Sequence, residues 1–479
     1  MRVPFAVAPV TLSFVLAAIA ACGSDSSSPS GDTPGSSGTS GTSGTSGTSG
    51  TSGTSGIGTS GTSGASGTSG SSGTSGSSGT SGSSGDGGPS DASNHDSGPW
   101  TVGPHPALPQ IQSAGGVVLT APKVMAIYFD GYDYAAQVSD LAATLAAQPY
   151  WAAATQEYGV GALTGLPAVQ IHETPPATIA DSAIQTWLKG KLGAGAPLGA
   201  ADAQTIYTIY YPTSTTVTQQ TAKSCVQFGG YHSNVSVGGI NVPYAVIPEC
   251  ATLNGQSGVD VVTVATSHEW IEAATDPYPM ASGAYNQIDA DHVAWQVVFG
   301  GIENGDMCAE AEQNYNFLGT YAHKIQRGWS NAAASANGDP CQPSFPAQPF
   351  FSAAPVMTDS VTAYVGGFVP TTTKGVKVGG VGQSKTVPVQ VWSLADVGDI
   401  TLVALDVTSA LDTTKQPVVE LSLDKTTVHN GDTAQLTIKL LRATSFGENG
   451  AFLVEAKVGA KDDAGKQHTR NFWPGIAAP

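Results

Sequence analysis

The sequence predicts an α/β or α+β domain with a mixed sheet, followed by an all-β sandwich domain. Between residues 99 and 345, strand-like and helical patterns alternate, as they do in domains that pack helices against a mixed sheet. Residues 346–479 contain only short strand-like runs, separated by Gly and Asp turns. Two further segments precede these domains, a targeting segment over residues 1–22 and a linker over residues 23–98.

Residues 1–22 are predicted to be a lipoprotein signal peptide. Arg2 supplies a positive charge, and the apolar run from Val10 to Ala21 is too short to span a bilayer well. The run ends in Ile19-Ala20-Ala21-Cys22, which resembles a bacterial lipobox, so Cys22 is the expected lipidated residue. An ordinary signal peptide or a short membrane anchor is the alternative. Because Gly23 rather than Asp follows, we expect an outer-membrane lipoprotein of the bacterial cell envelope, exposed at the surface.

The next segment, residues 23–98, is predicted to be a disordered linker. It consists of Gly-Thr-Ser and Gly-Ser-Ser repeats with a few Asp residues and no Lys or Arg. With almost no apolar side chains it cannot bury a core. A flexible coil of this length has a mean span of roughly 50 Å, enough to hold a domain clear of the membrane.

The charge balance excludes some partners. Lys and Arg total 18 against 36 Asp and Glu, so the chain has a net charge of −18 and no basic patch for nucleic acid. An anionic membrane surface would repel this charge, which leaves the lipid anchor as the expected membrane contact. We expect the protein to be a monomer.

Local patterns predict the strands and helices of the first domain, which begins near Pro99. The predicted strands, rich in β-branched and aromatic residues, are Lys123–Phe129, Val169–His172, Thr205–Tyr211, Tyr244–Ile247 and Tyr321–Ser330. The predicted helices are Tyr134–Glu157, as one or two Ala-rich helices, and Ile179–Leu192.

A further helix is predicted from Thr263 to Pro277. Ala, Glu, Ile and Trp fill it, and Pro277 ends it. His268 and Glu272 are four residues apart, so they lie on one face and could chelate one divalent cation. Glu269 lies beside His268, where it could hold a water bound to that cation. The spacing is that of the His-Glu-x-x-His helix of zinc peptidases, with Glu in place of the second His.

The alternative is that these side chains are solvated or cap the helix. However, charged residues make up only 11% of the chain, and three ionisable side chains lie in an otherwise apolar helix. Buried carboxylates are costly unless they are paired or bound to a metal. We therefore expect a metal site.

Four motifs between Pro99 and Cys341 resemble a group of secreted bacterial proteins. They are Gly229–Ser233 (Gly-Gly-Tyr-His-Ser), Ser267–Pro277 (Ser-His-Glu-x-x-Glu-Ala-x-Thr-Asp-Pro), Glu303–Cys308 (Glu-x-x-Asp-x-Cys) and Trp329–Asn331. More distantly, the domain resembles the plant EXORDIUM, or phosphate-induced, family, which has a similar His-Glu helix followed by an acidic motif with Cys. The resemblance implies a zincin-like fold.

The third metal ligand has three candidates beside His268 and Glu272. A zinc ion usually takes four ligands, and an enzyme leaves one position for water. Glu303 is the first choice, because in gluzincin peptidases a downstream Glu completes the site. Asp306 would then orient the histidine, or be the ligand itself. His232, in a Gly-flanked loop, is the third candidate, with a structural histidine as its alternative.

These residues predict a membrane-anchored, extracytoplasmic metal-dependent protein of the peptidase type. Zn²⁺ is the expected cofactor, with Ca²⁺ or Mn²⁺ as alternatives because a carboxylate-rich site suits a harder cation. The substrate would be a peptide or protein, hydrolysed by metal-activated water with Glu269 as the general base. The alternative is a catalytically silent cell-surface binding protein with a structural metal site. An open cleft at Glu269 favours the peptidase, and four protein ligands closing the site favour the alternative.

The chain has five cysteines. Apart from Cys22, four remain in an exported, oxidising setting, and four cysteines allow three disulfide pairings. We predict the two sequence-local pairs, Cys225–Cys250 and Cys308–Cys341. These would hold the loops on either side of the metal helix.

The last domain, residues 346–479, contains no cysteine and no catalytic pattern. Its strand-like runs are Val361–Phe368, Thr386–Trp392, Ile400–Val407, Val418–Leu423, Thr433–Leu440 and Ala451–Val458. Asn430-Gly431-Asp432 is the clearest turn between them. The spacing predicts an immunoglobulin-like β-sandwich that serves as a binding or spacer module.

Overall fold

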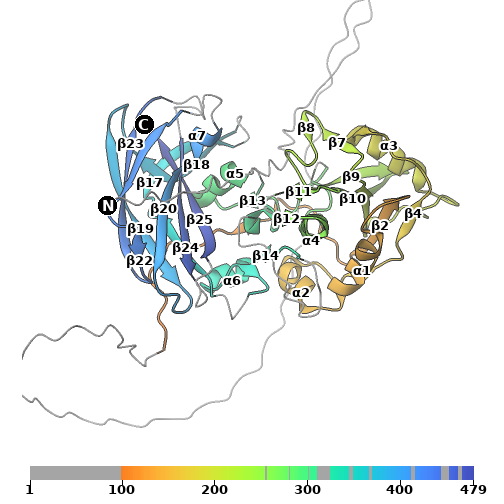
Figure 1. Ribbon diagram of the computed structural model, residues 1–479, viewed down its shortest axis with the longest axis horizontal. Helices are drawn as coiled ribbons and strands as arrows, with labels where there is room; N and C mark the ends of the chain where they lie inside the picture. Colours follow the sequence, from red (N-terminus) through yellow and green to blue (C-terminus); the bar gives the residue numbers. More distant parts are fainter. Residues whose placement is uncertain are drawn as a thin grey trace, which may run out of the picture. The chain divides into compact units, whose positions relative to one another are not determined.

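The described residues form a mixed α/β fold with many strands and few helices, shown by the computed structural model in Figure 1. It describes residues 99–253, 256–279, 281–299, 301–309, 324–344, 349–365, 369–411, 416–443, 452–461 and 467–478. The predicted signal peptide with Cys22 and the predicted linker lie outside these residues. Within the described part of the chain, no helix is long and apolar enough to cross a membrane.

A six-stranded mixed sheet lies at the centre of the first half. Its strands follow the order β3 (Thr164–Gly165), β2 (Lys123–Phe129), β6 (Thr205–Tyr211), β10 (Ile240–Pro248) and β9 (Tyr231–Val237), and β4 (Val169–Ile171) also pairs with β2. All neighbouring pairs are parallel except β9 and β10, which are antiparallel. The sequence prediction of a mixed sheet is therefore confirmed, and β9 forms one edge.

Strand β6 is buried on both faces because helices cover both. Its residues Thr-Ile-Tyr-Thr-Ile-Tyr-Tyr are all buried, which explains a continuous apolar run without alternation. Ile206 shares a core cluster with Trp270 of helix α4 (Val259–Thr275). Ile209 points to the opposite face and packs in a cluster with helix α3 (Asp181–Lys191).

The remaining elements of this half are short. They comprise α1 (Ala135–Ala146), α2 (Pro149–Thr155), α5 (Val293–Phe299), α6 (Asn331–Ser335), η1 (Gln156–Tyr158), η2 (Ala290–His292), η3 (Asp306–Cys308), and the strands β1 (Ile111–Gln112), β5 (Thr178–Ala180), β7 (Thr216–Gln219), β8 (Ala222–Lys223), β11 (Thr252–Leu253), β12 (Gln256–Ser257), β13 (Gln287–Ile288), β14 (Gly328–Trp329) and β15 (Cys341–Gln342). Helices α1 and α2 confirm the prediction of one or two helices over Tyr134–Glu157. Of the strand predicted over Tyr321–Ser330, the described part contains only β14.

Helix α4 begins earlier than predicted. It starts at Val259, after Gly258, whose φ of +60° suits a glycine. It ends at Thr275, two residues before Pro277, because a proline disfavours helical backbone in the residue that precedes it. Nearly the whole helix is buried, on the polar as well as the apolar side.

Two disulfides connect Cys225 with Cys250 and Cys308 with Cys341, which confirms the predicted pairing. The first joins the loop before β9 to the end of β10, and the second joins η3 to β15. By the chain-entropy model each contributes about 3 kcal/mol to stability. Disulfides are typical of proteins that fold outside the reducing cytoplasm.

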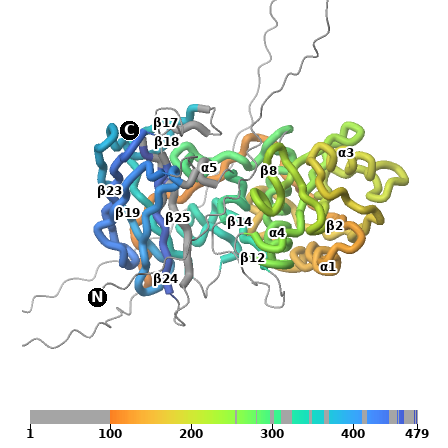
Figure 2. Tube along the Cα trace, turned by 45° about the horizontal axis from the view of Figure 1, so that its top comes forward, coloured from red at the N-terminus to blue at the C-terminus, as the bar shows by residue number. Residues whose placement is uncertain are grey.

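Two sheets share one core in the second half. The four-stranded sheet has the order β16 (Phe351–Pro355), β19 (Ser384–Ser393), β23 (Thr433–Leu440) and β21 (Val419–Leu423). The six-stranded sheet has the order β17 (Asp359–Val365), β18 (Val369–Lys377), β25 (Gln467–Ala478), β24 (Phe452–Lys461), β20 (Ile400–Asp406) and β22 (Thr427–Val428), and α7 (Val407–Leu411) follows β20. One apolar cluster draws on both sheets, whose strands lie together in Figures 1 and 2.

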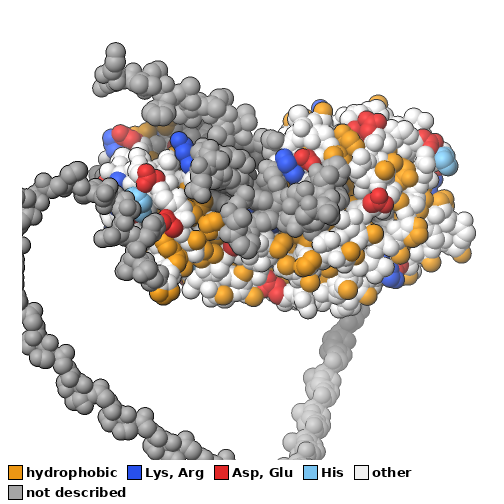
Figure 3. Space-filling view, turned by 60° about the horizontal axis from the view of Figure 1, so that its bottom comes forward, with side chains coloured by type: hydrophobic (Ala, Val, Ile, Leu, Met, Phe, Trp, Pro, Cys, Tyr) orange, Lys and Arg blue, Asp and Glu red, His pale blue; other side chains and the backbone are white. Residues whose placement is uncertain are grey.

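Residues on either side of the predicted domain boundary also pack together. Trp329 belongs to the same buried cluster as Phe350 and Trp392. The described residues form one compact unit, and the boundary between residues 345 and 346 stays a prediction. On the face shown in Figure 3, acidic side chains are scattered among hydrophobic and uncharged ones, with few Lys or Arg.

Candidate metal centre

Helix α4 carries three ionisable side chains into the interior. His268 and Glu272 lie one turn apart, with His268 Nε2 3.1 Å from Glu272 Oε1. The side chains of His268, Glu269 and Glu272 are only 12%, 6% and 4% exposed. Because burial removes the solvation of these polar groups, each of them needs a partner inside the protein.

The edge strand β9 brings His232 to the same place. His232 lies in a strand opposite Ala245 of β10, and not in the predicted loop. Its Nδ1 is 3.4 Å from Glu269 Oε2 and 3.6 Å from Glu272 Oε2. Gly230 permits this approach, because a Cβ atom at that position would lie 2.9 Å from Glu269 Oε1.

The segment after α5 supplies two more carboxylates, Glu303 and Asp306. The backbone N–H of Asp306 donates to Glu272 Oε1 at 2.9 Å, which ties this segment to helix α4. The backbone N–H of Glu303 donates to Asp306 Oδ2 at 3.3 Å. The Cys308–Cys341 disulfide follows directly and anchors the segment to β15.

These side chains form two groups of possible metal ligands. The His268 group is His268, Glu272 and Asp306, and the His232 group is His232, Glu272 and Glu303; within each, the ligand atoms lie within 4.8 Å of one another. Glu272 belongs to both, with Oε1 facing His268 and Oε2 facing His232. Glu303, the first choice for the third ligand, therefore belongs to the His232 group, whereas Asp306 belongs to the His268 group.

Two buried atoms in the His232 group have no hydrogen-bond partner among the described residues. They are His232 Nε2 and Glu303 Oε1, which lie 3.7 Å apart. Two atoms that bind one zinc ion at about 2.0–2.1 Å with tetrahedral angles are separated by about 3.4 Å. A buried polar atom without a partner costs about 1–3 kcal/mol, and coordination to one cation would satisfy both. The residues present therefore fit a divalent cation.

The carboxylates of the site perturb one another. Burial, and then the charge of Glu272, raise the pKa of Glu303 well above its usual value. The same causes raise the pKa of Asp306 to about 8, against the opposing effect of His268. Burial also disfavours the charged form of Glu272, but His268, His232 and the backbone N–H of Asp306 together lower the pKa of Glu272. The site thus concentrates carboxyl groups whose charged forms a bound cation would favour.

Gln326 orients His268. Gln326 Nε2 donates to the carbonyl oxygen of Gly305 at 2.7 Å, so its Oε1 faces His268 Nδ1 at 3.0 Å and accepts from it. When Nδ1 carries the proton, Nε2 has the free lone pair that a metal ligand needs. Sequence analysis missed Gln326, which lies 58 positions after His268 and in none of the motifs.

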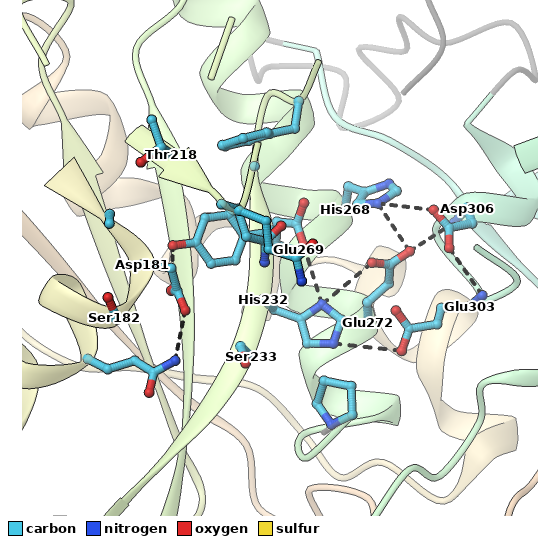
Figure 4. Close-up of a pocket in the computed structure, with 18 residues that line it drawn as sticks. Asp181, Ser182, Thr218, His232, Ser233, His268, Glu269, Glu272, Glu303 and Asp306 are labelled. Atoms are coloured by element: carbon cyan, nitrogen blue, oxygen red, sulfur yellow. Dashed lines mark hydrogen bonds and ion pairs between the residues drawn. The ribbon is translucent and has the colours of Figure 1, made fainter. Parts of the chain in front are cut away.

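The site faces a cavity of about 540 Å³ that is open to solvent. One end of the cavity is lined by His232, His268, Glu269, Glu272, Glu303 and Asp306 (Figure 4). All the residues predicted for the metal site thus meet here, although they come from three separate segments of the chain. Their roles as ligands or as a base stay predictions.

Comparisons with known proteins do not identify a family for this chain. No protein-family model matches it, and no curated protein matches it. The chemical interpretation of the site therefore rests on its residues and the distances between them.

Proposed function

We propose that this protein is a metal-dependent peptidase that hydrolyses peptide bonds in a peptide or protein substrate. The proposal is carried by the position of Glu269, which lines the cavity beside both ligand groups and belongs to neither. A set of metal ligands with a separate carboxylate beside it, open to a cavity, is what metal-assisted hydrolysis requires.

The proposed cofactor is Zn²⁺, with Ca²⁺ or Mn²⁺ as alternatives because carboxylates outnumber histidines in each group. His268 and Glu272 would hold the cation with Asp306, or Glu272 would hold it with His232 and Glu303. When bound, the cation supplies Lewis-acid activation of a water molecule and of the substrate carbonyl.

Glu269 is the proposed general base. Its carboxylate accepts a proton from the attacking water and returns it to the leaving amine. His232 Nδ1, 3.4 Å from Glu269 Oε2, helps to hold the carboxylate in position. Because Glu269 is nearly buried, the surrounding side chains restrict its orientation.

The second candidate is a catalytically silent cell-surface binding protein with a structural metal site. The low exposure of both ligand groups favours it, because structural sites are enclosed by protein. The open cavity favours the peptidase, because a substrate needs access to the cation and to Glu269.

Metal content and cleavage together test the two candidates. The purified full-length protein should contain a divalent metal, measured by inductively coupled plasma mass spectrometry, and should cleave members of a mixed peptide library. A chelator should abolish the cleavage, and added metal should restore it. If metal is bound but no peptide is cleaved, only the binding-protein candidate remains. An absence of metal would contradict both candidates.

The finer fold assignments are also proposals. A zincin-like fold for residues 99–345 is supported by the four motifs and their resemblance to the secreted bacterial and EXORDIUM groups. An immunoglobulin-like fold for residues 346–479 is supported by two sheets that share one apolar core.

We further propose that Cys22 anchors the protein as an outer-membrane lipoprotein. Replacing Cys22 with Ser should move the protein from the membrane fraction to the soluble fraction, because one residue carries the lipid. Cell fractionation followed by immunoblotting measures the change, and Ser24→Ala serves as the control that should stay in the membrane. A Cys22→Ser variant that remains in the membrane would contradict the anchor.

A further inference from the structure

The cavity extends beyond the metal ligands into a second region, which we call the Asp181 wing. It is lined by Asp181, Ser182, Gln185, Thr218 and Gln219, from helix α3 and strand β7. In Figure 4, Asp181 and Thr218 lie on the far side of Glu269 from Asp306. The metal chemistry proposed above uses none of these residues, although they line the same cavity.

Neutral groups hold the Asp181 carboxylate. Its Oδ1 accepts from the hydroxyls of Tyr231 and Tyr244, both at 2.7 Å. Its Oδ2 accepts from Gln185 Nε2 at 2.7 Å. A carboxylate has about four acceptor positions, so these three donors leave room for one more. None of the donors carries a positive charge, and no described residue that lines the cavity is Lys or Arg.

A second acceptor in the wing has no partner among the described residues. Gln219 Oε1 is buried and accepts no hydrogen bond. Leaving such an acceptor without a donor is unfavourable, so a ligand with N–H groups would be favoured here. This observation does not depend on Asp181, and it points to the same ligand chemistry.

Acidic side chains outnumber cationic ones in the described lining of the cavity. Its described lining includes five carboxylates, two histidines and no Lys or Arg; the carboxylates are Asp181, Glu269, Glu272, Glu303 and Asp306. A divalent cation would offset part of the negative charge of the four at the metal centre but would leave Asp181, at the other end, without a cationic partner. A guanidinium or ammonium group would bring the positive charge that the wing lacks, and N–H donors for the remaining acceptor position of Asp181.

We infer that the Asp181 wing is a subsite for a basic side chain, Arg or Lys, of the peptide, and that Asp181 selects it by charge. The inference rests on the proposed peptidase function for its substrate class. Asp181 is a specificity-determining residue here, and the metal centre remains the reacting part of the cavity.

Peptide binding tests the subsite without requiring turnover. The full-length Glu269→Gln protein, loaded with Zn²⁺, is titrated with blocked seven-residue alanine peptides that carry one Arg at each position in turn. Matched peptides carry citrulline, which has nearly the same shape and no charge. At one position or more, Arg should bind about 10- to 100-fold more tightly than citrulline, the range for a hydrogen bond between charged groups.

Three variants, each made in the Glu269→Gln protein, test whether the preference for Arg over citrulline arises at Asp181. Asp181→Asn should bring the ratio of Arg to citrulline affinity close to one, whereas Asp130→Asn, which removes an equal charge outside the cavity, should leave the ratio unchanged. Thr218→Lys places a cation in the wing and leaves the donors to Asp181 intact. It should abolish the preference even if Asp181→Asn fails to fold.

The outcomes separate the subsite from the peptidase. Equal affinity for Arg and citrulline peptides at every position, no binding of either, or a preference that persists in Thr218→Lys would overturn the subsite. An Arg preference in a wild-type protein that cleaves none of the peptides would leave the subsite standing and contradict the peptidase. Cleavage of peptides without any preference for Arg in binding would contradict the subsite and leave the peptidase standing.

Discussion

Replacing Glu269 with Gln should lower kcat/KM for peptide hydrolysis by roughly two to four orders of magnitude and leave the bound metal in place. Glu269 belongs to neither ligand group, so no metal ligand is lost. Gln keeps the size of the side chain where Gly230 approaches closely, but it cannot accept the proton. Kinetics on the best-cleaved library peptide and metal analysis of the variant measure the two effects.

Glu249→Gln provides a matched control for this substitution. Glu249 and Glu269 are similarly buried, with 6% and 5% of the whole residue exposed, but Glu249 does not line the cavity. Its replacement should change neither hydrolysis nor metal content. If Glu269→Gln instead empties the site, Glu269 is a ligand, and its assignment as the base is wrong.

Replacing Glu272 with Ala should remove the metal altogether. Glu272 belongs to both ligand groups, so the cation loses a ligand whichever group holds it. Activity should be lost, together with the stability that the metal provides, about 3 kcal/mol when free metal exceeds Kd roughly 100-fold. A chelator should lower the melting temperature of the wild type and leave that of the variant unchanged. A Glu272→Ala variant that retains its metal would contradict the site.

Two histidine variants then distinguish the ligand groups. His268→Ala disrupts one group and His232→Ala the other, so the variant that retains metal identifies the group that is not used. His292→Ala is the control. Its side chain is 13% exposed, close to the 12% of His268, but it pairs with Asp289 outside the cavity.

Short-range patterns predicted much of the mixed sheet and its helices. The strands over Lys123–Phe129 and Thr205–Tyr211 have the predicted bounds, because runs of β-branched and aromatic residues suit strands buried on both faces. Helix α3 lies within the predicted Ile179–Leu192. In the second half, β16, β18, β22 and β25 were not predicted, although all six predicted runs overlap described strands.

Strand β9, which carries His232, is the strand of the site that the sequence analysis did not predict. Its sequence Tyr-His-Ser-Asn-Val-Ser-Val contains enough polar residues to suggest a loop, yet Tyr231, Ser233 and Val235 alternate as buried positions. Gly238 and Gly239, with φ values of +60° and +86°, form the turn into β10. Alternation next to a Gly-Gly turn is a hairpin signal, and it was available in the sequence.

The sequence by itself determined the chemistry of helix α4 and the disulfide pairing. His268, Glu269 and Glu272 are brought together by helical periodicity alone, which is a local property of the backbone. Each disulfide joins cysteines only 25 or 33 residues apart, so the shortest pairings were also the ones formed.

Only the tertiary structure decided what surrounds that helix. It brings His232 from a sheet edge to one oxygen of Glu272, and a backbone N–H of Asp306 to the other. It also supplies Gln326 to orient His268, and it opens the cavity toward Asp181. These distances depend on the register between β9 and β10 and on how separate segments pack against α4, which no local sequence pattern specifies.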